Sequence, residues 1–268
     1  MSDNPVVETY SRLASEYDSV VNRSSCWGLL GHELLPYLRV KDVHRSVVDV
    51  GCGPGVELTH LAAHSKSSTR FIGVEPAPNM RQLAETKTAG YSNVEILPGG
   101  FEALPLRDNA VDYLYSILAF HWATDLESSV AELGRVLAPA GEMDLMFIGR
   151  ENGKEFIRAT TPVFFRYLRP AALLRAASLR HQLTIQETVQ LFQSVFPADR
   201  LRVEESFHTY YDTLEGHWAW WIRIEGQLVE IPHEKKDACD VALREAISTL
   251  TTESGIPYTV HLMHVRLG

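Results

Sequence analysis

Cysteine is scarce in this chain of 268 residues, and the three that occur lie far apart. Cys26, Cys52 and Cys239 are too few and too scattered for a disulfide framework or a zinc site. We therefore expect a reduced, cytoplasmic protein with no bound metal.

Long apolar runs and basic charge are also lacking. No apolar run approaches the ~18 residues of a membrane-spanning helix. Residues 1–5 contain neither a basic n-region nor an apolar h-region, so we expect no secretion signal. The 25 Lys and Arg face 34 Asp and Glu, a net charge of −9. Because generic nucleic-acid binding requires a basic surface, we expect neither a nucleic-acid nor a membrane partner.

What is present is ordinary for a globular enzyme. Hydrophobic residues make up 45% of the chain and charged residues 22%, which argues against wholesale disorder. The length allows a full core, in one domain with an elaboration, and we expect a monomer or a homodimer.

The strongest signal is a short strand followed by three glycines and a helix. Residues 47–50 are mostly β-branched and predict a buried central strand. Gly51, Gly53 and Gly55 follow, and residues 57–64 have a helical pattern. Glycine is needed where the chain turns sharply or where a ligand approaches bare backbone. The combination predicts a nucleotide-binding turn at the carboxyl end of a sheet.

The glycine spacing distinguishes this turn from a nicotinamide-binding fingerprint. That fingerprint has the pattern G-x-G-x-x-G, whereas here Val56 stands where the third glycine belongs. The form Asp49-x-Gly51-x-Gly53-x-Gly55 resembles the first motif of the class I, seven-stranded S-adenosylmethionine (SAM) dependent methyltransferases. The resemblance continues in order through about residues 45 to 150, the cofactor half of that fold.

This resemblance implies an α/β, Rossmann-like fold with a doubly wound, mostly parallel sheet of seven strands. It also implies a helical lid before the sheet and, after the fifth strand, an inserted helical cap. We expect the lid over residues 1–45 and the SAM-binding core over 46–149. We expect the cap over 150–198 and the strands and helices that complete the sheet over 199–268.

An acid at the end of the second predicted strand fits a ribose-binding role. Residues 70–75 predict this strand, and Glu75 follows Gly51 by 24 residues. A carboxylate accepts two hydrogen bonds in one plane, which suits the two hydroxyls of a ribose. In the family, residues after this acid flank the adenine, so Pro76 and Met80 are the expected apolar contacts.

Further cofactor contacts come from the turn and from the end of the fourth strand. The resemblance implies that the turn binds cofactor through Asp49, Gly51, Cys52, Gly53 and Gly55. It also implies that the end of the fourth strand, Ser116, Ile117 and Leu118, offers backbone to the methionine part of SAM.

The sequence departs from the family after the third strand. The family pattern there is Gly-Asp-Ala, in which the Asp receives a hydrogen bond from the adenine amino group. This chain has Gly99, Gly100 and Phe101 instead. We expect the backbone at Gly100 and Phe101 to contact adenine, with Glu102 or a water in place of the missing acid.

Tyr17 belongs to a segment similar to the lid of small-molecule methyltransferases, where the corresponding tyrosine covers the methionine end of the cofactor. Tyr17 is therefore a candidate cofactor contact and second candidate for a catalytic base. The alternative is that Tyr10 and Tyr17 only pack their helix onto the sheet.

His121 and Trp122 follow the fourth strand and face the expected position of the methyl group. Histidine titrates near neutral pH and can serve as a general base, so His121 is the first candidate catalytic residue. The alternative is that His121 positions substrate or packs.

Residues 150–198 concentrate positive charge in an otherwise acidic chain. Between residues 150 and 182 the local net charge is +5. Arg166 and Arg169 are candidate contacts for an anionic acceptor, although such charges are often only a solvated helix face. Trp218 and Trp221 belong to an aromatic cluster that either walls a substrate cavity or fills the core.

The resulting hypothesis is a SAM-dependent methyltransferase with a small-molecule acceptor and S-adenosylhomocysteine (SAH) as product. Residues 104–126 are similar to carboxyl O-methyltransferases, including those that esterify malonyl carrier protein, so a carrier-bound carboxylate acceptor is an alternative. The rival hypotheses are an NAD-dependent oxidoreductase and a SAM-binding protein that transfers no methyl group.

Overall fold

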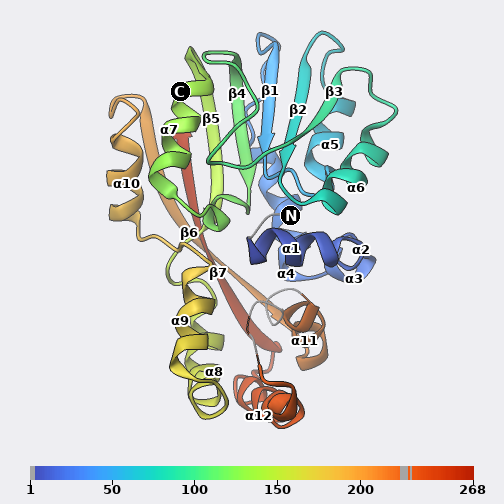
Figure 1. Ribbon diagram of the computed structural model, residues 1–268, viewed down its shortest axis with the longest axis vertical. Helices are drawn as coiled ribbons and strands as arrows, with labels where there is room; N and C mark the ends of the chain where they lie inside the picture. Colours follow the sequence, from blue (N-terminus) through green and yellow to red (C-terminus); the bar gives the residue numbers. More distant parts are fainter. Residues whose placement is uncertain (1–3, 224–228, 230) are drawn as a thin grey trace.

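A seven-stranded sheet forms the centre of the computed structural model, which describes residues 4–223, 229 and 231–268 (Figure 1). The strand order is β3-β2-β1-β4-β5-β7-β6. The strands are β1 Ser46–Val50, β2 Arg70–Glu75, β3 Val94–Pro98, β4 Val111–Ile117, β5 Leu137–Ile148, β6 Leu201–Asp212 and β7 Ile256–Leu267. The first five are parallel, whereas β7 runs antiparallel to both β5 and β6. The predicted α/β sheet of seven strands, mostly parallel, is confirmed, and it is mixed because its last strand β7 is inserted antiparallel.

Helices cover both faces of the sheet, which explains why the central strands are apolar without alternation. The helices of this core are α5 Val56–His64, α6 Pro78–Thr88, α7 Leu126–Val136 and α10 Ile185–Gln193. Leu58 of α5 packs on one face of the sheet with Val47 and Phe71. Leu133 of α7 and Phe192 of α10 pack on the other face.

Helix α10 corrects the expectation that residues 150–198 form one cap. A capping box between Thr184 and Glu187 starts this helix as a separate element. Its apolar residues then join the core cluster beside α7, where Phe192 is fully buried. The inserted segment outside the core is therefore limited to α8 Lys154–Tyr167 and α9 Pro170–Ser178.

Strands β6 and β7 extend beyond the sheet and support a second body of helices. β6 pairs with β7 along its whole length, whereas β5 pairs only with residues 262–267 of β7. The remaining ribbon is flanked by α11 Leu214–Arg223 and α12 Lys236–Ser248, opposite α8 and α9 (Figure 1). We call α8, α9, α11 and α12 the lower lobe. Its core gathers Phe156, Trp220 and Leu243 around Tyr258 of β7.

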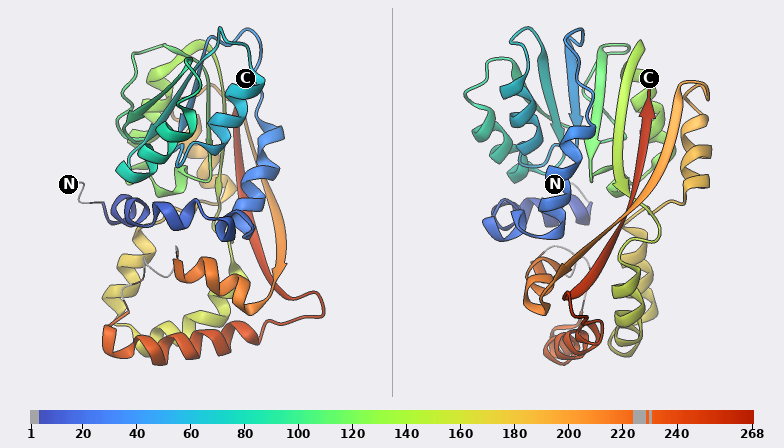
Figure 2. Two further views of the ribbon diagram at one scale, coloured as in Figure 1. Left: turned by 90° about the vertical axis from the view of Figure 1, so that its right-hand side faces the viewer. Right: turned by 180° about the vertical axis from the view of Figure 1, so that it is seen from behind.

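The N-terminal helices form a layer between the sheet and the lower lobe (Figure 2). They are α1 Pro5–Arg12, α2 Ala14–Tyr17, α3 Val20–Arg23 and α4 Cys26–Leu34, followed by the short η1 Leu35–Tyr37. Asn79 of α6 donates its side-chain amide to the Ser11 carbonyl at 2.8 Å, and Lys87 pairs with Asp18 at 2.5 Å. These contacts hold the first helices against α6.

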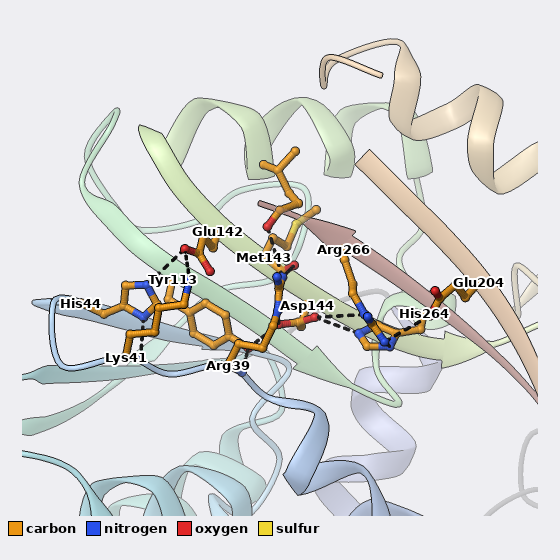
Figure 3. A network of polar contacts seen from close by, with 11 residues as sticks. Arg39, Lys41, His44, Tyr113, Glu142, Met143, Asp144, Glu204, His264 and Arg266 are labelled. Atoms are coloured by element: carbon orange, nitrogen blue, oxygen red, sulfur yellow. Dashed lines mark hydrogen bonds and ion pairs between the residues drawn. The ribbon is translucent and has the colours of Figure 1, made fainter. Parts of the chain in front are cut away.

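A buried ion network joins the segment before β1 to the sheet (Figure 3). The Asp144 carboxylate on β5 is fully buried and receives hydrogen bonds from Arg39 at 2.9 Å and from the Tyr113 hydroxyl at 2.6 Å. His264 of β7 lies 2.9 Å from its other oxygen. These partners keep the pKa of Asp144 below its ordinary value despite burial. The network connects β4, β5, β7 and the chain that leads from the N-terminal layer.

Candidate functional site

A cavity lies at the carboxyl ends of β1, β2 and β4, between the sheet and the helices α1 and α2. Its volume is about 300 Å³, and we call it the upper cavity. Nine of the predicted cofactor residues line it, namely Tyr17, Gly51, Gly53, Glu75, Pro76, Met80, Gly100, Phe101 and Ile117. The structure therefore brings together residues that are up to a hundred positions apart in the chain.

The glycine turn exposes bare backbone to this cavity. Gly51, Gly53 and Gly55 all have positive φ, which other residues rarely adopt. A Cβ on Gly51 would lie 2.4 Å from the Cβ of Ala119, so no side chain fits there. A Cβ on Gly53 would meet no atom within 4 Å. The space above Gly53 is thus open to a ligand that approaches the backbone.

Glu75 is buried at the end of β2, and its carboxylate is held in place by backbone amides. The Gly53 amide donates to one oxygen at 2.9 Å and the Ala77 amide donates to the other at 2.8 Å. Each oxygen keeps a further lone pair for a ligand in the cavity. Burial raises the pKa of Glu75 above its ordinary value, and the two amides partly oppose this shift. The arrangement fits two neighbouring hydroxyl donors.

Further acidic groups surround the turn. Burial raises the pKa of Asp49 well above its ordinary value, and the nearby charges of Glu57 and Glu75 add to the shift. Burial and the same two acids raise the pKa of Tyr17. Among the described residues, the lining of the cavity itself carries two carboxyl groups, of Glu75 and Glu102, and no basic side chain, which suits a cationic ligand better than an anionic diphosphate.

Glu102 occupies the space beside the position where the family has its adenine-binding acid. One of its oxygens receives a hydrogen bond from the Thr124 hydroxyl at 2.7 Å. Its other oxygen lies 3.4 Å from the place where a Cβ on Gly100 would be. Glu102 also lines the upper cavity. It therefore places a carboxylate there, although it stands two residues after Gly100, the position where the family has its acid.

The end of β4 lines the cavity through a strained turn rather than through Ser116. Ser116 is fully buried and lies outside the lining. Leu118 has a φ of 56°, a left-handed conformation that is uncommon for leucine, and its amide donates to the Met146 carbonyl at 2.7 Å. Ile117, Leu118 and Ala119 border the cavity.

Three other predicted cofactor residues lie behind the turn rather than on the cavity. Asp49 and Cys52 are buried at 3% exposure each. Gly55 begins α5, where a Cβ would lie 3.0 Å from the Cβ of Ala84 in α6. These residues support the glycine turn on the side that faces away from the cavity.

An aromatic group separates the upper cavity from the lower lobe. The rings of Tyr10 and Tyr17 meet edge to face at 5.7 Å, and those of Tyr10 and Trp122 at 5.8 Å. His121 lies beneath them and lines a small space of about 40 Å³ with Trp27. Among the described residues, its Nδ1 has no hydrogen-bond partner. Burial, reinforced by the cation of Arg180, holds the pKa of His121 well below its ordinary value, so the ring is neutral at neutral pH.

A second cavity, which we call the lower cavity, extends into the lower lobe. Its volume is about 320 Å³. Trp122 lines both cavities and therefore stands between them. Other lining residues come from α8, α9, α11, β7 and the segments before α8 and after α9, and include Asn152, Phe156, Phe164, Arg180, Gln182, Trp221 and Tyr258.

The predicted substrate residues do not lie together: the two tryptophans lie at the lower cavity, whereas the two arginines lie on the surface. Trp221 lines the lower cavity, whereas Trp218 stacks on it from behind at 5.4 Å between ring centroids. Arg166 and Arg169 are exposed at the end of α8 and line none of the cavities described above. The basic cap therefore reaches the lower cavity through Arg180 instead.

The sequence patterns predicted neither Asn152 nor Gln182 as site residues, and Arg180 entered only as part of a charge pattern. The residue pair Asn152-Gly153 was one available signal, because Gly153 has a φ of 60° and turns the chain sharply beside the cavity. Nothing local in the sequence marks Gln182.

Two further findings concern metals and membranes. In the ranges 4–223, 229 and 231–268, no three His, Cys, Asp or Glu side chains converge as metal ligands. No helix in the same ranges combines the length and apolar character needed to cross a bilayer.

Comparison with known proteins matches the cofactor half of the chain. The sequence model of a family described as "Methyltransferase domain" matches residues 48–143. Demethylmenaquinone methyltransferase of Bacillus licheniformis is 27% identical over 55% of this chain and 63% of its own length. Malonyl-[acyl-carrier protein] O-methyltransferase of Gallionella capsiferriformans is 29% identical over 57% of this chain and 53% of its own. The chain thus covers less than two thirds of either relative.

A solved structure extends the likeness to the whole fold. Geranyl diphosphate C-methyltransferase from Streptomyces coelicolor, in complex with Mg²⁺, geranyl diphosphate and SAH, superposes with a TM-score of 0.52. The match covers 90% of this chain and 78% of that one at 14% identity, so it shows a shared fold.

Proposed function

We propose that the chain is a member of the class I, seven-stranded family of SAM-dependent methyltransferases and that it transfers a methyl group to a small-molecule acceptor. One observation carries this proposal. Bare backbone at Gly53 and the anchored carboxylate of Glu75 share the upper cavity, and a second cavity adjoins it on the other side of Trp122.

The residues around the upper cavity fit SAM in shape and charge. Glu75 offers two lone pairs to the ribose hydroxyls, and Gly53 leaves room for the cofactor against the backbone. The carboxyl groups of Glu75 and Glu102 on the cavity lining suit the positive sulfonium and ammonium groups. The same two groups, with no basic side chain among the described lining residues, suit the diphosphate of NAD poorly, which is why the oxidoreductase hypothesis is the weaker one. The SAH bound by the S. coelicolor relative supports this choice of cofactor.

SAM, when bound, supplies a methyl carbon that forms a bond to an acceptor lone pair while the carbon–sulfur electron pair stays on sulfur. The chain's own residues then bind, align and exclude water. Tyr10, Tyr17 and Trp122 form an apolar partition at the junction of the cavities. His121 presents a neutral ring there and takes a proton from the acceptor when the acceptor is a hydroxyl.

The acceptor enters from the lower lobe in this proposal and is a small molecule with an anionic group. The likeness to malonyl-[acyl-carrier protein] O-methyltransferase supports a carboxylate acceptor. A carrier-bound carboxylate is the second candidate, favoured by the exposed cations Arg166 and Arg169 at the end of α8.

The test is turnover of SAM. The protein is incubated with SAM and with carboxylate, phenolic and carrier-bound acceptors, and SAH and methylated product are quantified by mass spectrometry. We expect stoichiometric SAH and methyl product with at least one acceptor. Binding of SAM without SAH formation from any acceptor would contradict methyl transfer and favour a protein that only binds the cofactor.

A further inference from the structure

Two uncharged side chains at one end of the lower cavity each keep a buried atom without a hydrogen-bond partner among the described residues, an acceptor on Asn152 and a donor on Gln182. We infer that this end binds a secondary amide of the acceptor, whose N–H donates to Asn152 and whose C=O accepts from Gln182. This inference rests on the proposed function, because it names a group that the same carboxylate acceptor carries next to its reacting end.

The acceptor atom belongs to Asn152. This residue is 2% exposed, and its Nδ2 donates to the Tyr258 hydroxyl at 3.1 Å. Its Oδ1 has no partner in the part of the chain that the structure describes. Buried carbonyl oxygens without a partner are rare in folded proteins, because such a group has lost its water without a replacement. An N–H group of a ligand in the cavity supplies the missing hydrogen bond.

The donor atom belongs to Gln182. Its Nε2 is buried and has no hydrogen-bond partner within residues 4–223, 229 and 231–268. This amide nitrogen only donates, so it complements a carbonyl oxygen of a ligand, whereas Asn152 Oδ1 complements an N–H. Both side chains are uncharged, so the matching group of the ligand is uncharged as well.

Asn152 and Gln182 come from two segments that are hydrogen-bonded to each other. The Arg150 amide donates to the Leu183 carbonyl at 3.0 Å, and the Arg150 Nε donates to the Gln182 carbonyl at 3.3 Å. The turn before α8 and the segment after α9 therefore meet at this end of the cavity. A trans amide carries its N–H and C=O on neighbouring atoms that point in opposite directions, so it reaches one group on each segment. A hydroxyl carries both functions on one oxygen.

This end of the cavity lies next to the proposed site of methyl transfer. The His181 amide donates to the His121 carbonyl at 2.8 Å, so Gln182, the next residue, follows a segment that is fixed beside the His121 loop. Trp122 of the same loop lines both cavities. The bound amide therefore lies close to the reacting carboxylate of the acceptor and is separated from it by a few bonds.

The other end of the lower cavity suits an apolar body. Phe156, Ile157 and Phe164 of α8 line the cavity together with Trp221 of α11. Phe164 stands ten residues after Lys154, the start of α8, which is about 15 Å along the helix axis. Its ring stacks on that of Trp221 at 6.1 Å between centroids, and flat apolar surfaces of this kind favour a ring or an alkyl chain. A carboxylate, an amide and an apolar body in this order describe an N-acylated amino acid with an apolar acyl group.

The experiment measures binding rather than turnover, with ligands that share a phenyl ring and a carboxylate. Hippurate carries the amide N–H and C=O, 4-oxo-4-phenylbutanoate keeps the carbonyl without the N–H, and 4-phenylbutanoate lacks both. A fourth acid, 4-hydroxy-4-phenylbutanoate, carries a hydroxyl in place of the amide. Each acid is titrated into the protein with and without SAH by calorimetry, with tryptophan fluorescence as a second readout.

Each of two variants removes one of the two protein groups. Asn152→Leu removes the acceptor Oδ1, and Gln182→Met removes the donor Nε2 at nearly constant side-chain length. Gln186→Met is the matched control, because Gln186 is exposed on α10 and does not line the lower cavity.

We expect the wild type to bind hippurate about fivefold or more tightly than 4-oxo-4-phenylbutanoate, and that acid more tightly than 4-phenylbutanoate by a similar factor. Each step leaves one buried protein group without its partner, which is the reason for the loss. Asn152→Leu should erase the first step and keep the second, whereas Gln182→Met should erase the second and keep the first. Gln186→Met should reproduce both steps of the wild type.

Three results would overturn the inference. The first is that hippurate fails to bind with a Kd below about 1 mM, with or without SAH. The second is that folded Gln182→Met keeps both steps of the wild type, and this variant carries the test alone if Asn152→Leu does not fold. The third is that 4-hydroxy-4-phenylbutanoate binds as tightly as hippurate.

SAH affinity, measured in the same samples, reports on the fold and on the upper cavity. Absent SAH binding alongside the expected hippurate binding would contradict the proposed function and leave the amide site standing.

Discussion

Removal of the Glu75 carboxylate should weaken cofactor binding at the upper cavity strongly. The Gly53 and Ala77 amides hold the two oxygens at 2.9 and 2.8 Å, so the carboxylate is already oriented before a ligand arrives. A hydrogen bond to a charged group contributes about 1.5–3 kcal/mol. Part of the gain from two such bonds is offset because Glu75 is buried and its charged form is already disfavoured.

We therefore expect Glu75→Ala to cost about 2–3 kcal/mol of SAM affinity, a roughly 30- to 150-fold higher Kd. Glu75→Gln should lose nearly as much. Its amide nitrogen would face the amide of either Gly53 or Ala77, so one donor opposes another.

The assay is calorimetric titration with SAM and SAH, and circular dichroism verifies that each variant is folded. Glu95→Gln is the matched control, because Glu95 is an exposed acid on the neighbouring strand β3, paired with Arg70. It should bind SAM like the wild type. Equal SAM affinity of folded Glu75→Ala and of this control would refute the ribose assignment.

Three further changes separate binding, chemistry and stability. Gly53→Val should abolish SAH binding in a folded protein, because the valine side chain would occupy the open space above Gly53, where no protein atom lies within 4 Å and where the cofactor approaches the backbone. A folded variant that binds SAH normally would refute the open-backbone account. His121→Gln should lower kcat for a hydroxyl acceptor and leave SAH affinity unchanged. The pKa of His121 lies well below 6.5, so the wild-type rate should stay level as the pH falls from neutral to 6.5 and should decline only at lower pH. A decline centred at or above pH 6.5 would argue against His121 as the base. Asp144→Asn should lower the free energy of unfolding by about 3 kcal/mol in urea titrations, because it leaves Arg39 and His264 without their buried charge partner. Asp42→Asn breaks the exposed pair with Lys66 and should cost under about 1 kcal/mol; equal losses in both variants would contradict the buried network.

The parts of the site that the sequence predicted are those with local causes. The glycine turn depends on backbone conformations that only glycine adopts easily, so Gly51 and Gly53 are visible in the pattern itself. Glu75 is also visible, because a strand of known length after this turn carries its last residue to the same edge of the sheet.

The parts that the sequence did not predict depend on which surface a helix meets. The apolar pattern of α10 shows that one face is buried, but only the packing of Phe192 beside α7 shows that this helix belongs to the core. In the tryptophan cluster, one residue of helix rotation separates Trp220 in the core of the lower lobe from Trp221 on the cavity.

The charges of the inserted segment present the same difficulty. Seven cations occur between residues 150 and 182, and local pattern does not indicate which one turns inward. Arg180 does so because the neighbouring His181 amide is bound to the His121 carbonyl, a contact across sixty residues of sequence. Arg166 and Arg169 have no such contact and remain exposed.

The most direct test of the central claim is a parallel calorimetric titration of the purified protein with SAM, SAH and NAD. The account predicts micromolar binding of SAM and SAH and no signal with NAD, since the carboxyl groups of the cavity lining suit a cationic cofactor better than a diphosphate. Silence toward SAM and SAH in a folded protein, or binding of NAD in their place, would contradict it.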